Sequence, residues 1–147
     1  MKLMSIHLTA FIDGASRGNP GEAAFGVLIY RDGNLECRCG QRLGIATNNV
    51  AEYFACIMSL IECGKLGADV VTVYSDSQLL VKQVTGEYRI KDDWLKRLNA
   101  VITELRGLFT RVEFVHIPRE KNREADAFVN SLYPVKSADS ADLFLSR

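Results

Sequence analysis

Residues 6–30, IHLTAFIDGASRGNPGEAAFGVLIY, decide the fold of this chain. From Ile6 to Ile12 every second residue is apolar, which is the period of two of a strand with one buried face. The alternation stops at Asp13, which precedes a glycine, so we expect the first strand to end there. The next residues, GASRGNPGE at 14–22, are rich in the small and turn-forming residues that connect two strands.

Two further strands follow this turn. AAFGVLIY at 23–30 is predicted to be the second strand, and LECRCGQRL at 35–43 the third, with a polar turn at 31–34 between them. Three strands joined by short turns predict an antiparallel meander.

The hydrophobic period changes to that of a helix at Asn49. Apolar residues then recur at i, i+4, i+7 and i+11, namely at Val50, Phe54, Ile57 and Ile61. The remaining expected elements are a buried strand at 70–76, a short helix at 77–84, a helix carrying Leu95, Leu98, Ile102, Leu105 and Phe109, a strand at 112–118 and a helix at 122–133. This order, βββαβααβα, predicts an α/β fold with helices on the faces of a mixed sheet. We expect one domain at 1–133, followed by a tail at 134–147.

The composition limits the classes of function. Eighteen basic and eighteen acidic side chains give a formal net charge of zero, which argues against a strongly basic nucleic-acid clamp. Any binding to a polyanion should be modest and sensitive to salt.

The four cysteines show no zinc-binding pattern with either histidine, so we expect free thiols in a reducing compartment. They are Cys37, Cys39, Cys56 and Cys63. No targeting segment is evident, and no apolar run approaches the roughly 20 residues of a membrane span. We therefore expect a cytoplasmic protein without membrane contacts.

Four acidic residues lie at the borders of predicted strands and helices, and each has a purely structural explanation. Asp13 could form a turn, and Glu52 could complete a capping box with Asn49. Asp76 could cap the helix that begins at residue 77, and Asp126 could interact with a helix dipole. Under this interpretation the protein is a structural or interaction domain.

The same four acids could instead converge. If the strands that precede Asp13 and Asp76 are adjacent and parallel, their ends open at one edge of the sheet, where Glu52 and Asp126 could join them. Four clustered carboxylates repel one another unless a cation is present. Mg²⁺ prefers such oxygen ligands, and two ions about 3.5–4 Å apart can stabilise the attacking and leaving oxygens of a phosphoryl displacement.

Five segments together resemble the signature segments of type 1 ribonuclease H, the ribonuclease HI family, in the family's order. They are IDGASRGNPG at 12–21, TNNVAEY at 47–53, YSDSQ at 74–78, GEYRIKDD at 86–93 and HIPREKNREADA at 116–127. The resemblance implies a ribonuclease H-like fold with a five-stranded mixed sheet. It further implies an endonuclease that hydrolyses the RNA strand of RNA/DNA hybrids, leaves 5′-phosphate and 3′-hydroxyl ends, and uses two Mg²⁺ ions, for which Mn²⁺ substitutes. We expect the protein to be a monomer.

The resemblance also implies roles for individual residues. Asp13 would bridge both metal ions, Asp126 would complete the site that holds the attacking water, and Glu52 with Asp76 would face the leaving oxygen. The positions that match hybrid contacts, partly to the 2′-hydroxyls that distinguish RNA from DNA, are Gly14, Asn19, Asn48, Asn49 and Gln78. Thr47 matches a contact to a DNA-strand phosphate. Turn chemistry is the alternative explanation for Asn19 and Asn48.

The chain departs from the family in several places. We expect it to lack the basic protrusion and the amino-terminal hybrid-binding module, and we expect Trp94 to be a packing residue rather than one that stacks on a base. Asp92 stands after Lys91, at a position where relatives often carry an Asn that contacts a phosphate. The change weakens the expectation of a phosphate contact by residue 92. We expect Arg119 to assist product release, with His116 as the other candidate. Cleavage of double-stranded RNA, and a non-catalytic binding module on the same scaffold, stay open at this point.

Overall fold

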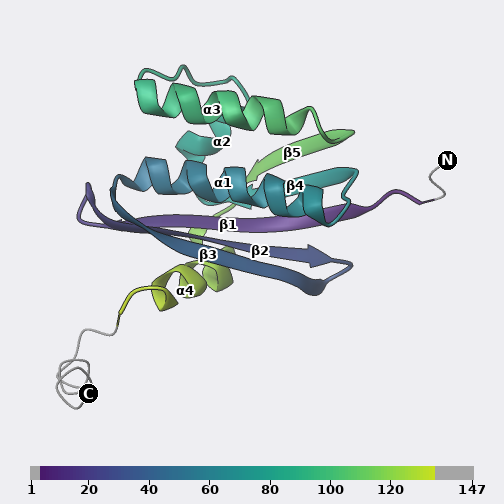
Figure 1. Ribbon diagram of the computed structural model, residues 1–147, viewed down its shortest axis with the longest axis horizontal. Helices are drawn as coiled ribbons and strands as arrows, with labels where there is room; N and C mark the ends of the chain where they lie inside the picture. Colours follow the sequence, from purple (N-terminus) through teal and green to yellow (C-terminus); the bar gives the residue numbers. More distant parts are fainter. Residues whose placement is uncertain (1–3, 135–147) are drawn as a thin grey trace, which may run out of the picture.

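The computed structural model describes residues 4–134 (Figure 1). The strands are β1 (His7–Arg17), β2 (Gly21–Arg31), β3 (Asn34–Ala46), β4 (Val70–Ser75) and β5 (Arg111–His116). The helices are α1 (Asn48–Lys65), α2 (Gln78–Val84), α3 (Asp93–Arg106) and α4 (Arg123–Ser131), with a short 3₁₀ helix at Arg119–Lys121. The predicted order βββαβααβα is confirmed. The predicted tail lies outside the described residues from position 135 onward.

The strands form one five-stranded mixed sheet in the order β3-β2-β1-β4-β5. β1 pairs antiparallel with β2, and β2 with β3, which confirms the meander. β4 and β5 are parallel to β1 and lie on its other side. The mixed sheet is therefore the one that the sequence predicts.

Helices cover the two faces of the sheet unequally. α1 packs on β1 and β2 with α3 beside it, whereas α4 contacts β1 and β2 from the opposite face (Figure 1). Leu8, Ala10 and Ile12 of β1 are fully buried in the main core, as their alternation predicts. Burial of such apolar surface is the main favourable term in folding.

The prediction that the first strand ends at Asp13 is wrong, because β1 continues to Arg17. Its antiparallel pairing with β2 runs on from Asp13↔Gly26 to Arg17↔Glu22. The parallel pairing with β4 ends earlier, at Ile12↔Ser75. Asp13 is therefore the first residue of β1 beyond its pairing with β4.

The cysteines are free thiols, as predicted. Burial raises the pKa of Cys56 and of Cys63 to about 12, so both thiols stay protonated at neutral pH. Within residues 4–134, no helix is long and apolar enough to cross a membrane.

Candidate active site

The four acids come from four different elements. Asp13 lies in β1, and Asp76 directly follows β4. Glu52 lies in α1, and Asp126 lies in the first turn of α4. Because β1 and β4 are parallel neighbours, Asp13 and Asp76 are the next pair beyond the last register pair, Ile12↔Ser75. The two strands are thus adjacent and parallel, which is the condition under which we expected the four acids to converge.

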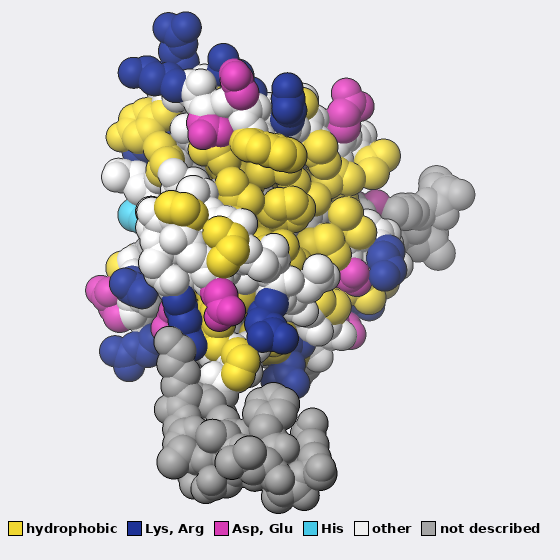
Figure 2. Space-filling view, turned by 60° about the vertical axis from the view of Figure 1, so that its left-hand side comes forward, with side chains coloured by type: hydrophobic (Ala, Val, Ile, Leu, Met, Phe, Trp, Pro, Cys, Tyr) yellow, Lys and Arg dark blue, Asp and Glu magenta, His cyan; other side chains and the backbone are white. Residues whose placement is uncertain are grey.

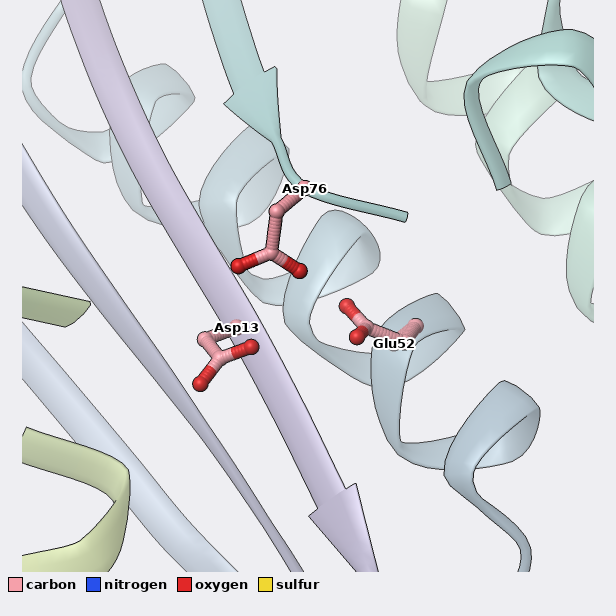
Figure 3. A group of neighbouring side chains, drawn as sticks. All are labelled: Asp13, Glu52 and Asp76. Carbon is pink, nitrogen blue, oxygen red and sulfur yellow. The ribbon is translucent and has the colours of Figure 1, made fainter. Parts of the chain in front are cut away.

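Three of the carboxylates form a compact cluster. Asp13, Glu52 and Asp76 each place one carboxylate oxygen within 4.8 Å of the others, and their side chains point toward one another (Figure 3). Asp13 and Glu52 are only 5% and 7% exposed. Asp126 is outside this group of three, but it lines the same cavity, and its charge contributes to raising the pKa of Asp13. All four acids thus meet at one end of the sheet.

The structural explanations for three of the acids do not hold. α1 is capped by Thr47, whose hydroxyl accepts from the Val50 N–H at 3.2 Å, so Glu52 forms no capping box. α2 is capped by Ser77, so Asp76 is not a cap. Asp13 lies within a paired strand and forms no turn. Only Asp126 keeps its alternative explanation, because it lies near the positive end of the α4 dipole.

Gly14 brings α1 against β1. A Cβ added at Gly14 would lie 2.5 Å from the Ala51 carbonyl carbon and 2.5 Å from the Glu52 amide nitrogen. Real Cβ atoms do not approach other atoms so closely, so only glycine permits this contact. The close approach places Glu52 beside Asp13 in the cluster.

Burial and mutual repulsion both raise the pKa values of acids in the cluster. Burial, followed by the charges of Asp76 and Asp126, raises the pKa of Asp13 from 3.8 to about 8. Burial, followed by Asp13 and Asp76, raises the pKa of Glu52 well above its usual value, while Arg119 lowers it. The protein alone therefore disfavours the fully ionised cluster, and a bound cation would relieve this cost.

The donor set fits a hard divalent cation. All candidate ligand atoms are carboxylate oxygens, which are the ligands of Mg²⁺. In addition, Glu52 Oε2 is buried and has no hydrogen-bond partner. An unpartnered buried carboxylate oxygen is costly, and coordination of a cation would satisfy it.

The predicted substrate-contact residues divide into two sets. Gly14, Asn48 and Asn49 line the same cavity of about 400 Å³ as the four acids. Asn19, Thr47 and Gln78 are outside its lining. The side-chain oxygen of Asn19 accepts from the Asn48 N–H at 3.0 Å, which is the turn chemistry considered as its alternative.

Arg119 and His116 lie in different places. Arg119 belongs to the lining of the acidic cavity and acts electrostatically on Glu52. His116 is exposed at the end of β5 and is not in that lining. Ala15, Ser16 and Ser77 line the cavity as well, although the sequence analysis did not single them out.

A second, larger cavity of about 520 Å³ lies between the open face of the sheet and the start of α4. Phe11 and Tyr30 are among its lining residues, and it contains none of the four acids. The larger of these two cavities is therefore not the one that contains the acidic cluster.

Trp94 is not a packing residue, contrary to the prediction, because 63% of its surface is exposed. Leu95, Leu98 and Ile102 form the buried face of α3, and Trp94 is adjacent to that face. The Arg97 guanidinium lies 6.0 Å from the centre of the Trp94 ring.

On the face shown in Figure 2, basic side chains lie above and below a hydrophobic area and are mixed with acidic ones, as expected for a neutral chain.

The sequence analysis also missed Asn122, which is hydrogen-bonded to one of the four acids. It is 1% exposed, and its side-chain amide donates to the Ile12 carbonyl and to Asp76. The signals in the sequence were its place within HIPREKNREADA at 116–127 and its position four residues before Asp126, at the start of a helix.

Known proteins resemble this chain in sequence and in fold. Residues 11–132 match the family model described as reverse transcriptase-like. Ribonuclease HI from Halobacterium salinarum is 43% identical over 122 residues, which cover 82% of this chain and 61% of that protein. The crystal structure of RNase H1 from Halobacterium salinarum has a TM-score of 0.83 at 40% identity, covering 86% of this chain and 96% of that one. LC11-RNase H1, solved in complex with an RNA/DNA hybrid, has a TM-score of 0.80 at 40% identity, covering 84% and 94%.

These matches extend over nearly all of the described sheet and helices. The chain spans less than two thirds of the length of the halobacterial ribonuclease HI. It covers almost the whole chain of the solved halobacterial structure, whose fold it shares. The chain therefore belongs to the ribonuclease HI family.

Proposed function

We propose that this protein is a metal-dependent endoribonuclease that hydrolyses the RNA strand of RNA/DNA hybrids and leaves 5′-phosphate and 3′-hydroxyl ends. The observation that carries the proposal is the cluster of Asp13, Glu52 and Asp76, with carboxylate oxygens within 4.8 Å of one another. The complex of LC11-RNase H1 with an RNA/DNA hybrid supports the substrate class.

The four acids would hold two Mg²⁺ or Mn²⁺ ions. Asp13 would contact both ions, Asp126 would serve the ion on the side of the attacking water, and Glu52 with Asp76 the ion on the side of the leaving oxygen. When bound, the ions supply Lewis-acid stabilisation of the attacking and leaving oxygens. No serine or cysteine nucleophile is needed.

Residues around the acids would select the RNA strand. Gly14, Asn48 and Asn49 share the cavity with the acids, so their polar groups are within reach of a strand bound there. Hydrogen bonds to ribose 2′-hydroxyls would distinguish RNA from DNA. Asn19 and Gln78 would extend these contacts, and Thr47 would help to hold a DNA-strand phosphate.

Arg119 would act on the product. It is a cation in the cavity of the acids, where it can attract the phosphate that departs after cleavage. His116, which is exposed at the end of β5, is the weaker candidate. A monomeric state and a cytoplasmic location stay predictions from the sequence.

The test is cleavage of a hybrid with end-labelled RNA in Mg²⁺ or Mn²⁺, beside duplex RNA and single-stranded RNA. We expect internal cuts in the hybrid RNA and loss of these cuts in Asp126→Asn. Asp93→Asn is the matched control, since the Asp93 side chain is 88% exposed on α3 and does not line the acidic cavity. Hybrid binding without cleavage by the folded protein would favour a binding module instead, and equal cleavage of duplex RNA would broaden the substrate class. Mass spectrometry of the products identifies their ends.

A further inference from the structure

Asn122 connects the parts of the chain that carry three of the four acids. Its Nδ2 donates to the carbonyl of Ile12, the residue before Asp13, at 2.8 Å. The same Nδ2 donates to Oδ2 of Asp76 at 3.1 Å. Its own backbone carbonyl accepts from the N–H of Asp126 at 3.1 Å. One buried residue is thus bonded to β1, to the end of β4 and to α4.

The ordinary explanations for a buried Asn at a helix start do not apply. Asn122 is the N-cap of α4, but its side chain makes no capping hydrogen bond. Its Oδ1 is buried and has no partner, which is a cost to the folded state. Both groups that face Nδ2 are acceptors, a carbonyl and a carboxylate, so the NH₂ side of the amide must be the one turned toward them.

We propose that Asn122 is a positioning residue for the metal centre, which holds the Asp76 carboxylate at a fixed distance from Asp13 while it anchors the turn that carries Asp126. This inference rests on the proposed function, because it assumes that the acids bind divalent ions. A donor to a ligating carboxylate orients it, and loss of such a partner typically costs 10–100-fold in metal affinity or activity. No other residue type of this size donates two hydrogen bonds without a charge.

Two substitutions separate donation from packing. Asn122→Asp keeps the shape but turns an acceptor toward the Ile12 carbonyl and Asp76. Asn122→Ala removes the amide altogether. Asn34→Ala is the matched control, since Asn34 is exposed at the start of β3, where it pairs with Arg31 of β2.

The experiment is a titration of each folded variant with Mn²⁺ alone, with free Mn²⁺ measured by electron paramagnetic resonance. We expect both Asn122 variants to bind Mn²⁺ about 10–100-fold more weakly than the wild type, with Asn34→Ala unchanged. In cleavage assays, the half-saturating Mn²⁺ concentration should rise while the KM for the hybrid stays the same.

Three outcomes would overturn the proposal. These are wild-type Mn²⁺ affinity in a folded Asn122→Ala protein, an equal loss in Asn34→Ala, or failure of both Asn122 variants to fold, which would make the residue purely structural. Hybrid cleavage by the wild type tests the proposed function separately, because the Mn²⁺ titration contains no nucleic acid.

Discussion

Gly14 of β1 and Glu52 of α1 are in backbone contact, and a Cβ at Gly14 would lie only 2.5 Å from the Glu52 amide nitrogen. Strands β2 and β3 lie between these two residues in the sequence. The contact determines how deeply Glu52 enters the acidic cluster, because α1 cannot approach β1 more closely than this position allows.

Gly14→Ala should therefore lower both stability and metal binding. The added methyl group meets backbone atoms, which cannot rotate away, and overpacking of this kind costs about 1–3 kcal/mol. Urea unfolding measures the loss. Gly64→Ala in α1, the helix that Gly14 contacts, is the control, because its Cβ would meet only Phe109 at 3.7 Å, and it should stabilise the protein by up to about 1 kcal/mol. Equal stability of Gly14→Ala and wild type would contradict the packing argument.

Asp13→Asn should abolish cleavage and yet stabilise the metal-free protein. Burial, followed by the charges of Asp76 and Asp126, raises the pKa of Asp13 to about 8, so the folded protein must keep this carboxyl largely protonated at pH 7, whereas the unfolded chain ionises it. The substitution removes this cost. We expect a gain on the order of 1–3 kcal/mol in EDTA at pH 7, since one pKa unit corresponds to about 1.4 kcal/mol. Thermal unfolding and the hybrid assay measure the two effects. A destabilised Asp13→Asn protein would show that the carboxylate contributes to the fold.

The stability of the metal-free protein should fall as the pH rises from about 4 to about 8. The pKa of Asp13 is raised from 3.8 to about 8 on folding, so its contribution is fully present below pH 4 and is lost as the pH passes through 8. The stabilisation by Asp13→Asn should accordingly be larger at pH 8 than at pH 5. Denaturant melts in EDTA at the two pH values check this, and an equal difference at both would refute it.

Mg²⁺ or Mn²⁺ should raise the melting temperature of the wild type by binding to the native state. At a concentration 100 times Kd, binding stabilises by about 2.7 kcal/mol. The shift should disappear in Asp13→Asn and persist in Asp93→Asn, whose exposed side chain lies on α3. A shift of the same size in Asp13→Asn would place the bound ion elsewhere.

Arg119→Ala should lower kcat more than His116→Ala does. Arg119 lines the acidic cavity, whereas His116 is exposed outside it. We expect kcat to fall about tenfold for Arg119→Ala, which is about 1.4 kcal/mol, with little change in metal affinity. Burst kinetics show whether product release is the affected step. The opposite order of the two variants would assign the role to His116.

The order of strands and helices was predictable from the sequence because it depends on residues close together in the chain. Alternation at Leu8, Ala10 and Ile12 predicts a strand, and the stripe that starts at Val50 predicts a helix. The four acids could be selected on the resemblance of their segments to a known family. Their structural alternatives could not be dismissed, since a capping box at Asn49 is as compatible with the sequence as the observed cap at Thr47.

The tertiary structure decided what depends on contacts between distant segments. β1 passes Asp13 because β2 continues to pair with it, and β4 stops before Asp13. Trp94 is exposed because the rotation of α3 directs Leu95 to the core. Asn122 faces Asp76 only because α4 starts beside the ends of both strands. The sequence by itself determined the elements and the chemical groups, since periodicity is local. Only the packed sheet decided which of these groups come into contact, because the residues in each contact lie tens of positions apart in the sequence.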